Sequence, residues 1–161
     1  ARDILREATT LGVNAIHFVR TEKGDPNYAA STLWRSGEWR RHAIAGAEQA
    51  FATRIPHVTH GRPLVEALSA LSRDGVRLAL DNYATADGLS ARRDLAAPLT
   101  LAIGGERGWS EDERSLLREH GFALVHLGPR VLRTETACLA ALVLARAKLG
   151  LMELTALPPR E

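Results

Sequence analysis

The sequence has few of the features that mark secreted, membrane-bound or nucleotide-hydrolysing proteins. Its single cysteine, Cys138, excludes a disulfide within these 161 residues and fits a reducing compartment, so we expect a cytoplasmic protein. No apolar run reaches the roughly 18 residues that a membrane-spanning helix needs, and we expect no membrane partner. Neither G-x-G-x-x-G nor G-x-x-x-x-G-K-[ST] occurs, which argues against a Rossmann oxidoreductase and a P-loop nucleotidase.

A set of metal ligands and a strong charge bias are missing as well. His57 and His60 lie three residues apart, but no third ligand or cysteine cluster accompanies them, so we expect no metal site. Lysine and arginine total 21 against 19 aspartates and glutamates, which leaves a net charge of +2. A balance this even permits an RNA partner without indicating one.

Apolar segments suited to strands alternate with helical segments along the chain. The alternation predicts an α/β fold with a mostly parallel sheet and helices on both of its faces. At this length we expect one domain, over residues 1–154, followed by a frayed tail at 155–161. Strands are expected at residues 13–19, 55–59, 76–80, 99–103 and 122–127, and the main helices at 2–11, 38–53, 63–73, 110–120 and 134–149.

The first of two strand-to-helix junctions lies at residues 103–110, I-G-G-E-R-G-W-S. The apolar run before it predicts a buried strand, and the paired glycines let the backbone turn sharply or approach a ligand closely. Ser110 and Glu113 have the spacing of a capping box, which predicts that a helix starts here. Taken alone, the stretch is more typical of an ordinary strand–helix turn than of a ligand-binding loop, because glycines are common at such turns.

The second junction lies at residues 127–137, L-G-P-R-V-L-R-T-E-T-A. Thr134 is the expected N-cap of the last helix. Arg130, Arg133 and Glu135 stand near the start of that helix, where backbone N–H groups favour an anionic or electron-rich ligand. An arginine–glutamate pair that merely holds the loop is the alternative, and the residues alone leave both interpretations open.

Together the two junctions resemble the RsmE family, the SAM-dependent 16S rRNA (uracil-N3)-methyltransferases of the SPOUT class. The family pattern is I-G-x-E-x-G-[WFL]-S-x-x-E, a short helix, a strand, and then L-G-P-R-V-L-R-T-E-T-A. The likeness covers nearly the whole chain, although Gly105 replaces the family's usual proline and Arg107 its usual glycine. Four upstream segments also resemble the family, namely E-A-T-T-L-G-V at 7–13, R-T-E-K at 20–23, A-E-Q-A at 47–50 and R-I-P at 54–56.

The resemblance implies a fold and an assembly that residue patterns alone do not give. In the family the last helix threads a loop, which forms a C-terminal trefoil knot in a SPOUT-type α/β domain. The resemblance also implies a homodimer that binds S-adenosyl-L-methionine (SAM) between the knot loops and acts on 16S rRNA or the small ribosomal subunit. The PUA-like RNA-binding barrel with which family members begin is not expected within residues 1–161.

The resemblance further implies roles for individual residues. Arg133 would stabilise the uracil anion, because a protonated imide nitrogen is a poor nucleophile, and Glu135 would be either the base or the partner that positions an arginine. Arg20, Lys23 and Arg130 are expected to contact RNA. The cofactor pocket is expected to be lined, chiefly through backbone groups, by Leu80, Gly104, Gly105, Gly108, Leu127, Gly128, Leu132, Thr136 and Ala137.

A rival interpretation is a non-catalytic module, a knotted dimer that binds RNA or SAM and transfers nothing. The unusual Gly105 and Arg107 in the cofactor loop favour this interpretation. The retained Arg130, Arg133, Glu135 and Thr136 favour the enzyme.

Overall fold

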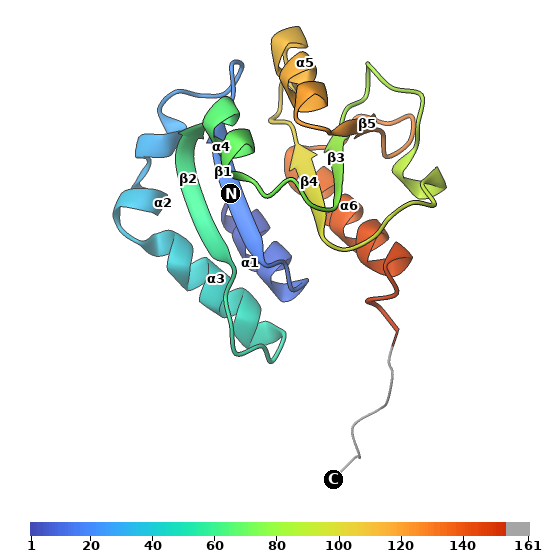
Figure 1. Cartoon of the computed structure of the whole chain (residues 1–161). Coiled ribbons are helices and arrows are strands. Elements are labelled where there is room, and N and C mark those ends of the chain that lie inside the picture. Colours follow the sequence, from blue (N-terminus) through green and yellow to red (C-terminus); the bar gives the residue numbers. More distant parts are fainter. Residues whose placement is uncertain (154–161) are drawn as a thin grey trace.

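The computed structural model describes residues 1–153, and the expected tail at 155–161 lies outside that range. Every strand and main helix that the sequence predicts is present, with boundaries shifted by a few residues (Figure 1). The strands are β1 (Ala15–Arg20), β2 (His57–Pro63), β3 (Val76–Leu80), β4 (Leu99–Ile103) and β5 (Ala123–Val125). The helices are α1 (Arg2–Thr10), α2 (Thr32–Arg35), α3 (Glu38–Gln49), α4 (Leu64–Ala70), α5 (Glu111–Glu119) and α6 (Thr134–Lys148), with 3-10 turns η1 (Tyr28–Ala30) and η2 (Leu89–Ala91).

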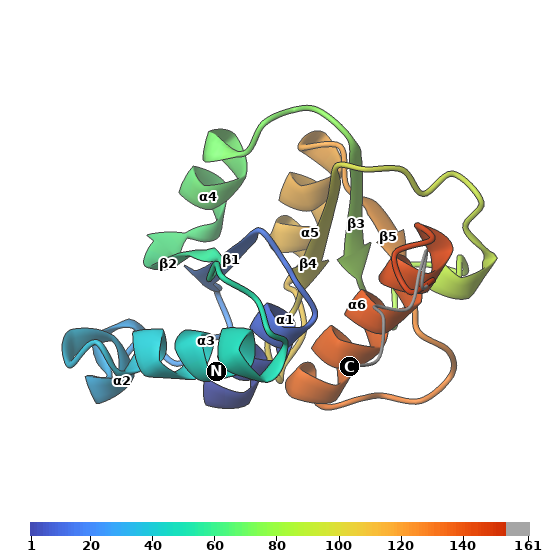
Figure 2. The ribbon, with the colours of Figure 1, turned by 90° about the horizontal axis from the view of Figure 1, so that it is seen from below.

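β3 is the middle strand of a three-stranded parallel sheet, with β4 on one side and β5 on the other. Successive β3 residues face opposite layers, as strand geometry requires. Leu78 packs with Val125 and with Ala141 of α6, whereas Ala79 packs in the cluster that holds Leu117 of α5. Figure 2 shows α5 and α6 on either side of these strands. The prediction of parallel strands covered on both faces is confirmed for this sheet.

β1 and β2 form a second parallel sheet, which α1, α2 and α3 cover on one face. The sequence predicted one sheet, and in this respect the structure differs. Among residues 1–153 no ladder joins β1 to β4, and residues of both strands line a cavity of about 1290 Å³. Contacts of α4 with β1 and α5, and of α1 with α6, connect the two halves. No helix between residues 1 and 153 is long and apolar enough to cross a membrane.

The parallel arrangement brings the two junctions to one edge of the three-stranded sheet. Leu80 and Ile103 are register partners at the ends of β3 and β4, so the segments that follow them start side by side. The segment before α6 reaches the same edge, where the Thr134 hydroxyl donates to the Gly104 carbonyl at 3.5 Å. The carboxyl ends of parallel strands are the usual place for a ligand site in α/β proteins.

Candidate active site

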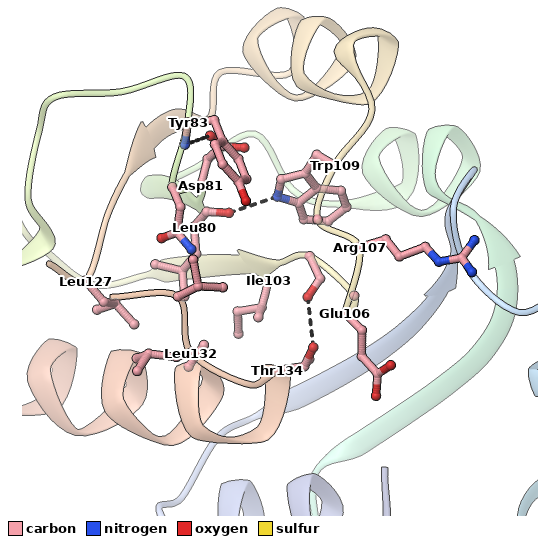
Figure 3. Close-up of a pocket in the computed structure, with 16 residues that line it drawn as sticks. Leu80, Asp81, Tyr83, Ile103, Glu106, Arg107, Trp109, Leu127, Leu132 and Thr134 are labelled. Carbon is pink, nitrogen blue, oxygen red and sulfur yellow. Dashed lines mark hydrogen bonds between the residues drawn. The ribbon is translucent and has the colours of Figure 1, made fainter. Parts of the chain in front are cut away.

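A pocket of about 190 Å³ lies where the two junctions meet (Figure 3). Its walls are the end of β3 at residues 80–83, the loop at 103–109, and the segment that leads into α6. Gly128 and Thr136 lie outside the lining. The other seven residues expected at a cofactor all line the pocket, namely Leu80, Gly104, Gly105, Gly108, Leu127, Leu132 and Ala137.

The pocket combines apolar side chains with bare backbone. Leu80, Leu127 and Leu132 supply apolar walls. A Cβ placed on Gly105 or Gly108 would meet no atom within 4 Å, so the backbone of this loop is open to a ligand. Gly108 also has a φ of 63°, a left-handed conformation that glycine adopts without strain. A planar group could therefore reach backbone donors and acceptors here.

The loop at 103–109 is anchored from two directions. Trp109 is only 1% exposed, and its indole Nε1 donates to the Leu80 carbonyl at 3.0 Å, so that oxygen already has a partner. Lys23, which was expected to contact RNA, donates from Nζ to the Trp109 carbonyl at 2.8 Å. The capping box of Ser110 and Glu113 is confirmed by both of its hydrogen bonds.

Glu113 makes a further contact that extends the anchor to the other half of the molecule. Its Oε1 accepts a hydrogen bond from the Glu22 amide at 2.8 Å, while its Oε2 serves the capping box. The loop after β1 and the loop after β4 are thus joined by two adjacent residues, Glu22 and Lys23.

Sequence reasoning missed the residues that follow β3. The Asp81 side chain is 2% exposed and forms an ion pair with Arg114 Nε at 2.7 Å. It also accepts hydrogen bonds from the amides of Tyr83 at 2.7 Å and Ala84 at 2.6 Å. Burial alone would raise the pKa of Asp81, but the Arg114 bond and these two amides outweigh it and lower that pKa. An aspartate directly after a strand, whose side chain can accept from the amide two residues on, is a turn signal that the sequence did contain.

The segment before α6 is held less firmly than the loop after β4. Thr134 was expected to be the N-cap, but α6 starts at Thr134 with Arg133 in the cap position and no side-chain cap. The Thr134 hydroxyl instead donates a hydrogen bond to the Gly104 carbonyl. Arg130 and Arg133 are exposed, and within residues 1–153 neither arginine forms an ion pair with Glu135. The Arg–Glu pair that could merely hold this loop is therefore not seen in the described part of the chain.

The remaining predicted residues lie around the pocket rather than in it. Arg20 is exposed at the last position of β1. Glu135 is half-buried in the first turn of α6 and lines the larger cavity, together with Lys23. That cavity shares the loop at 103–109 and Thr134 with the smaller pocket, so Glu135 lies next to a residue that lines both.

His126 holds the start of the second junction against the loop after β3. Its ring Nδ1 accepts from the Gly128 amide at 3.0 Å, so the proton is on Nε2, which faces the Ala86 carbonyl at 3.1 Å. Its own amide donates to the Asp87 carbonyl, and its carbonyl accepts from the Leu89 amide. Gly128, although outside the pocket lining, is therefore fixed by a neighbour that faces away from the pocket.

Neither a metal centre nor a reactive thiol is seen among the described residues. No group of three or more His, Cys, Asp or Glu side chains within residues 1–153 could hold a metal ion. Cys138 is buried in α6, and burial raises the pKa of its thiol to about 11. The thiol is therefore protonated at neutral pH and packs as an apolar group, as the sequence indicated.

Comparison with known proteins agrees with this geometry. Residues 1–146 match the profile of the RNA methyltransferase domain family. The chain belongs to this family. A curated relative from Treponema pallidum, named ribosomal RNA small subunit methyltransferase E, is 39% identical over 153 residues and covers 91% of this chain. The resemblance to the RsmE family is thereby confirmed.

Two solved structures are similar in fold. A ribosomal RNA small subunit methyltransferase E from Neisseria gonorrhoeae, bound to SAM, has a TM-score of 0.81 and 31% identity over 92% of this chain. A Legionella pneumophila protein described as a methyltransferase, also in complex with SAM, has a TM-score of 0.75 and 28% identity over 91% of this chain. The chain spans 58% of the Treponema relative and 60% of each of these two chains.

Proposed function

We propose that this chain is the catalytic domain of a SAM-dependent methyltransferase that modifies N3 of a uridine in 16S rRNA. The observation that carries the proposal is the pocket that the ends of both RsmE-like motifs line, in a chain of the RNA methyltransferase domain family. The name of the Treponema relative and the SAM in two similar structures support the reaction and the cofactor.

The residues present suit this cofactor. Apolar walls and a bare glycine backbone can hold an adenosine without a charged side chain, and SAM would supply an electrophilic methyl group on its sulfonium sulfur. The pocket has about 190 Å³, whereas sites that enclose a drug-sized ligand have roughly 300–1,000 Å³. We infer that the pocket takes the adenosine end of SAM and leaves the methyl end accessible to RNA.

Methylation replaces N3–H by N3–CH₃, so a proton must leave the nitrogen as the new bond forms. Arg133 is exposed at the start of α6, and we assign it to the negative charge that develops on the uracil ring. The partial positive charge at the helix N-terminus acts in the same sense. Glu135 lies two residues further and has no arginine partner in the described chain, which favours the role of proton acceptor over that of an arginine's positioning partner.

The expected RNA contacts divide into two groups. Arg20 and Arg130 are exposed, and we assign them to the phosphate backbone, where an arginine needs no particular base. Lys23 has its ammonium group on the Trp109 carbonyl, so we assign to it the anchoring of the pocket loop in addition to any contact with RNA.

A trefoil knot and a homodimer belong to the same proposal. The chain between β3 and β4 runs beside His126, to which Leu89 donates a hydrogen bond. α6 packs against η2 of that same connection, and Lys148 Nζ donates to the Arg92 carbonyl at 2.8 Å. These contacts are those expected of a helix threaded through the 81–98 loop. Large apolar side chains left exposed in and just after α6, at Val143, Leu151 and Met152, suit a surface that a second copy covers.

The non-catalytic module remains the second candidate, because Arg107 stands in the pocket loop where the family usually has glycine. The first test is calorimetric titration with SAM, followed by methyl incorporation into unmodified small subunits. The proposed enzyme binds SAM and incorporates methyl groups. Binding without incorporation supports the module, and the absence of binding contradicts both the cofactor and the reaction.

The second test isolates Arg133. We expect Arg133→Ala to lower kcat by about 100-fold or more while the Kd for SAM changes by less than about threefold. Arg118→Ala, at an exposed arginine of α5, is the matched control and keeps wild-type kinetics. Wild-type turnover by the Arg133 variant would remove this residue from the mechanism.

A further inference from the structure

Tyr83 is a large aromatic residue held in an unusual position. It is 76% exposed, yet it is one of the residues that line the 190 Å³ pocket. Its amide donates to Asp81 Oδ1 at 2.7 Å, and Asp81 is in turn fixed by the buried ion pair with Arg114. The fold thus holds the backbone of Tyr83 tightly. Because the ring buries little apolar area, it contributes little to the stability of the fold.

The ring is placed so that one side has a partner and the other does not. The Arg114 guanidinium carbon lies 6.0 Å from the ring centroid, over one face. Figure 3 shows the Tyr83 ring beside Asp81, on the side of the pocket where Leu80 and Trp109 also lie. With most of the ring exposed, its second face is open to a planar partner.

The other lining residues cannot offer the same contact. Trp109 is the second aromatic residue of the lining, but it is 1% exposed and packs in the core with Leu117. Val131 is exposed at the pocket but has no π-face. Tyr83 is therefore the aromatic surface that a ligand would meet in this pocket.

We propose that Tyr83 is a base-stacking residue, whose ring holds a planar nucleobase at the mouth of the pocket. The inference rests on the proposed function and extends it to a residue outside both RsmE-like motifs. The stacked group is a nucleobase, which is either the adenine of SAM or the target uracil. Aromatic rings stack on either base, and a side chain whose backbone is already ordered loses less entropy on binding.

The test compares three substitutions. Tyr83→Leu removes the π-face and keeps an apolar side chain, and Tyr83→Phe keeps the ring. Phe51→Leu makes the same change from ring to aliphatic chain at a residue that is 97% exposed and outside the lining of both cavities. The Kd for SAM is measured by calorimetry, and kcat and KM are measured with unmodified small subunits.

We expect Tyr83→Leu to weaken binding of one base by about 5- to 100-fold, the range that stacking on an aromatic side chain gives. Tyr83→Phe should retain most of the binding, because it keeps the ring, and Phe51→Leu should have the wild-type Kd and KM. A higher Kd for SAM with unchanged KM for the subunit identifies adenine as the stacked base. The reverse pattern identifies the uracil.

A readout independent of turnover completes the test. Stacking shifts the ring proton resonances of Tyr83 upfield when S-adenosylhomocysteine or a uridine-containing oligonucleotide is added, and Tyr83→Phe lets that resonance be assigned. The inference is overturned if the wild type binds SAM and methylates RNA while Tyr83→Leu keeps both constants. Failure of the proposed function is a different result, because then the wild type itself binds no SAM, and the stacking role falls with it.

Discussion

The two loops that form the pocket are supported in different ways. The loop at 103–109 is fixed by the Trp109 indole on Leu80, by Lys23 on the Trp109 carbonyl and by the Ser110–Glu113 capping box. The segment at 127–133 exposes Pro129, Arg130, Val131 and Arg133. The side-chain hydrogen bonds that hold it are the bond from the Gly128 amide to the His126 ring and, just after the segment, the long bond from Thr134 to the Gly104 carbonyl.

This difference separates residues that build the pocket from residues that are available to a ligand. The anchored loop is a preformed wall, whose shape the protein determines without any partner. The second segment carries most of the RsmE-like signature, yet its arginines have no ion-pair partner in residues 1–153. We infer that those side chains serve the ligand and contribute little to the free energy of folding.

The largest difference in unfolding free energy is expected between substitutions of Trp109 and Val131, which lie in different walls of the pocket. Trp109→Ala should lower the free energy of unfolding by about 3–5 kcal/mol, because it empties a filled core position. Val131 is 71% exposed, so Val131→Ala should stay within about 0.5 kcal/mol of the wild type. Urea denaturation followed by circular dichroism measures both. Similar losses in the two variants would contradict the distinction between the walls.

A smaller loss of unfolding free energy is expected when Arg114, which holds the end of β3 through its ion pair with Asp81, is substituted. Arg114→Met leaves the Asp81 carboxylate buried without its partner and should cost about 3 kcal/mol of unfolding free energy. Arg118→Met, on the same helix but exposed, is the control and should cost less than about 1 kcal/mol. Equal effects would show that the Asp81 pair does not hold the end of β3.

The same pair predicts how stability depends on pH. The pKa of Asp81 is lower in the folded state than in the unfolded chain, so its contribution is complete above the ordinary carboxyl range. That contribution is lost as the pH falls through the folded pKa. Unfolding free energies measured from pH 6 down to pH 3 should therefore decrease less steeply for Asp81→Asn than for the wild type. The exposed Asp112→Asn, which removes a carboxylate without an ion-pair partner in residues 1–153, is the control for the loss of one negative charge.

The smallest effect is expected for the bond between the two halves of the molecule. Lys23→Met removes one hydrogen bond to the Trp109 carbonyl and should cost about 1 kcal/mol. Arg20→Met, at an exposed position of the same region, should be nearly neutral. If both variants are equally stable, Lys23 is not an anchor of the loop and remains available to RNA.

Local sequence rules predicted those parts of the site whose partners are close in the chain. The capping box at Ser110 and Glu113 was correct because its bonds span three residues. The N-cap at Thr134 was wrong because the threonine hydroxyl found a partner 30 residues away, at Gly104. The spans of β3 and β4 were predicted correctly from their apolar runs, but the missing ladder between β1 and β4 has no local signal.

The residues after β3 show the same limit. In the sequence, Asp81 and Tyr83 belong to a polar connection, and nothing nearby marks them as part of a site. Their role depends on Arg114, which lies 33 residues from Asp81 and reaches it only when α5 packs against the sheet. Seven of the nine expected cofactor residues line the pocket. They could be named in advance because the family motifs identify them, whereas composition and periodicity do not.

The most direct test of a pocket with one preformed and one ligand-dependent wall is amide hydrogen exchange with and without SAM. We predict that the Gly108 and Ser110 amides, which already donate hydrogen bonds within the protein, are protected in the free protein and change little. Residues 127–137 should exchange faster in the free protein and become protected when SAM is added. Unchanged exchange in both segments at saturating SAM would contradict the assignment of this pocket to the cofactor.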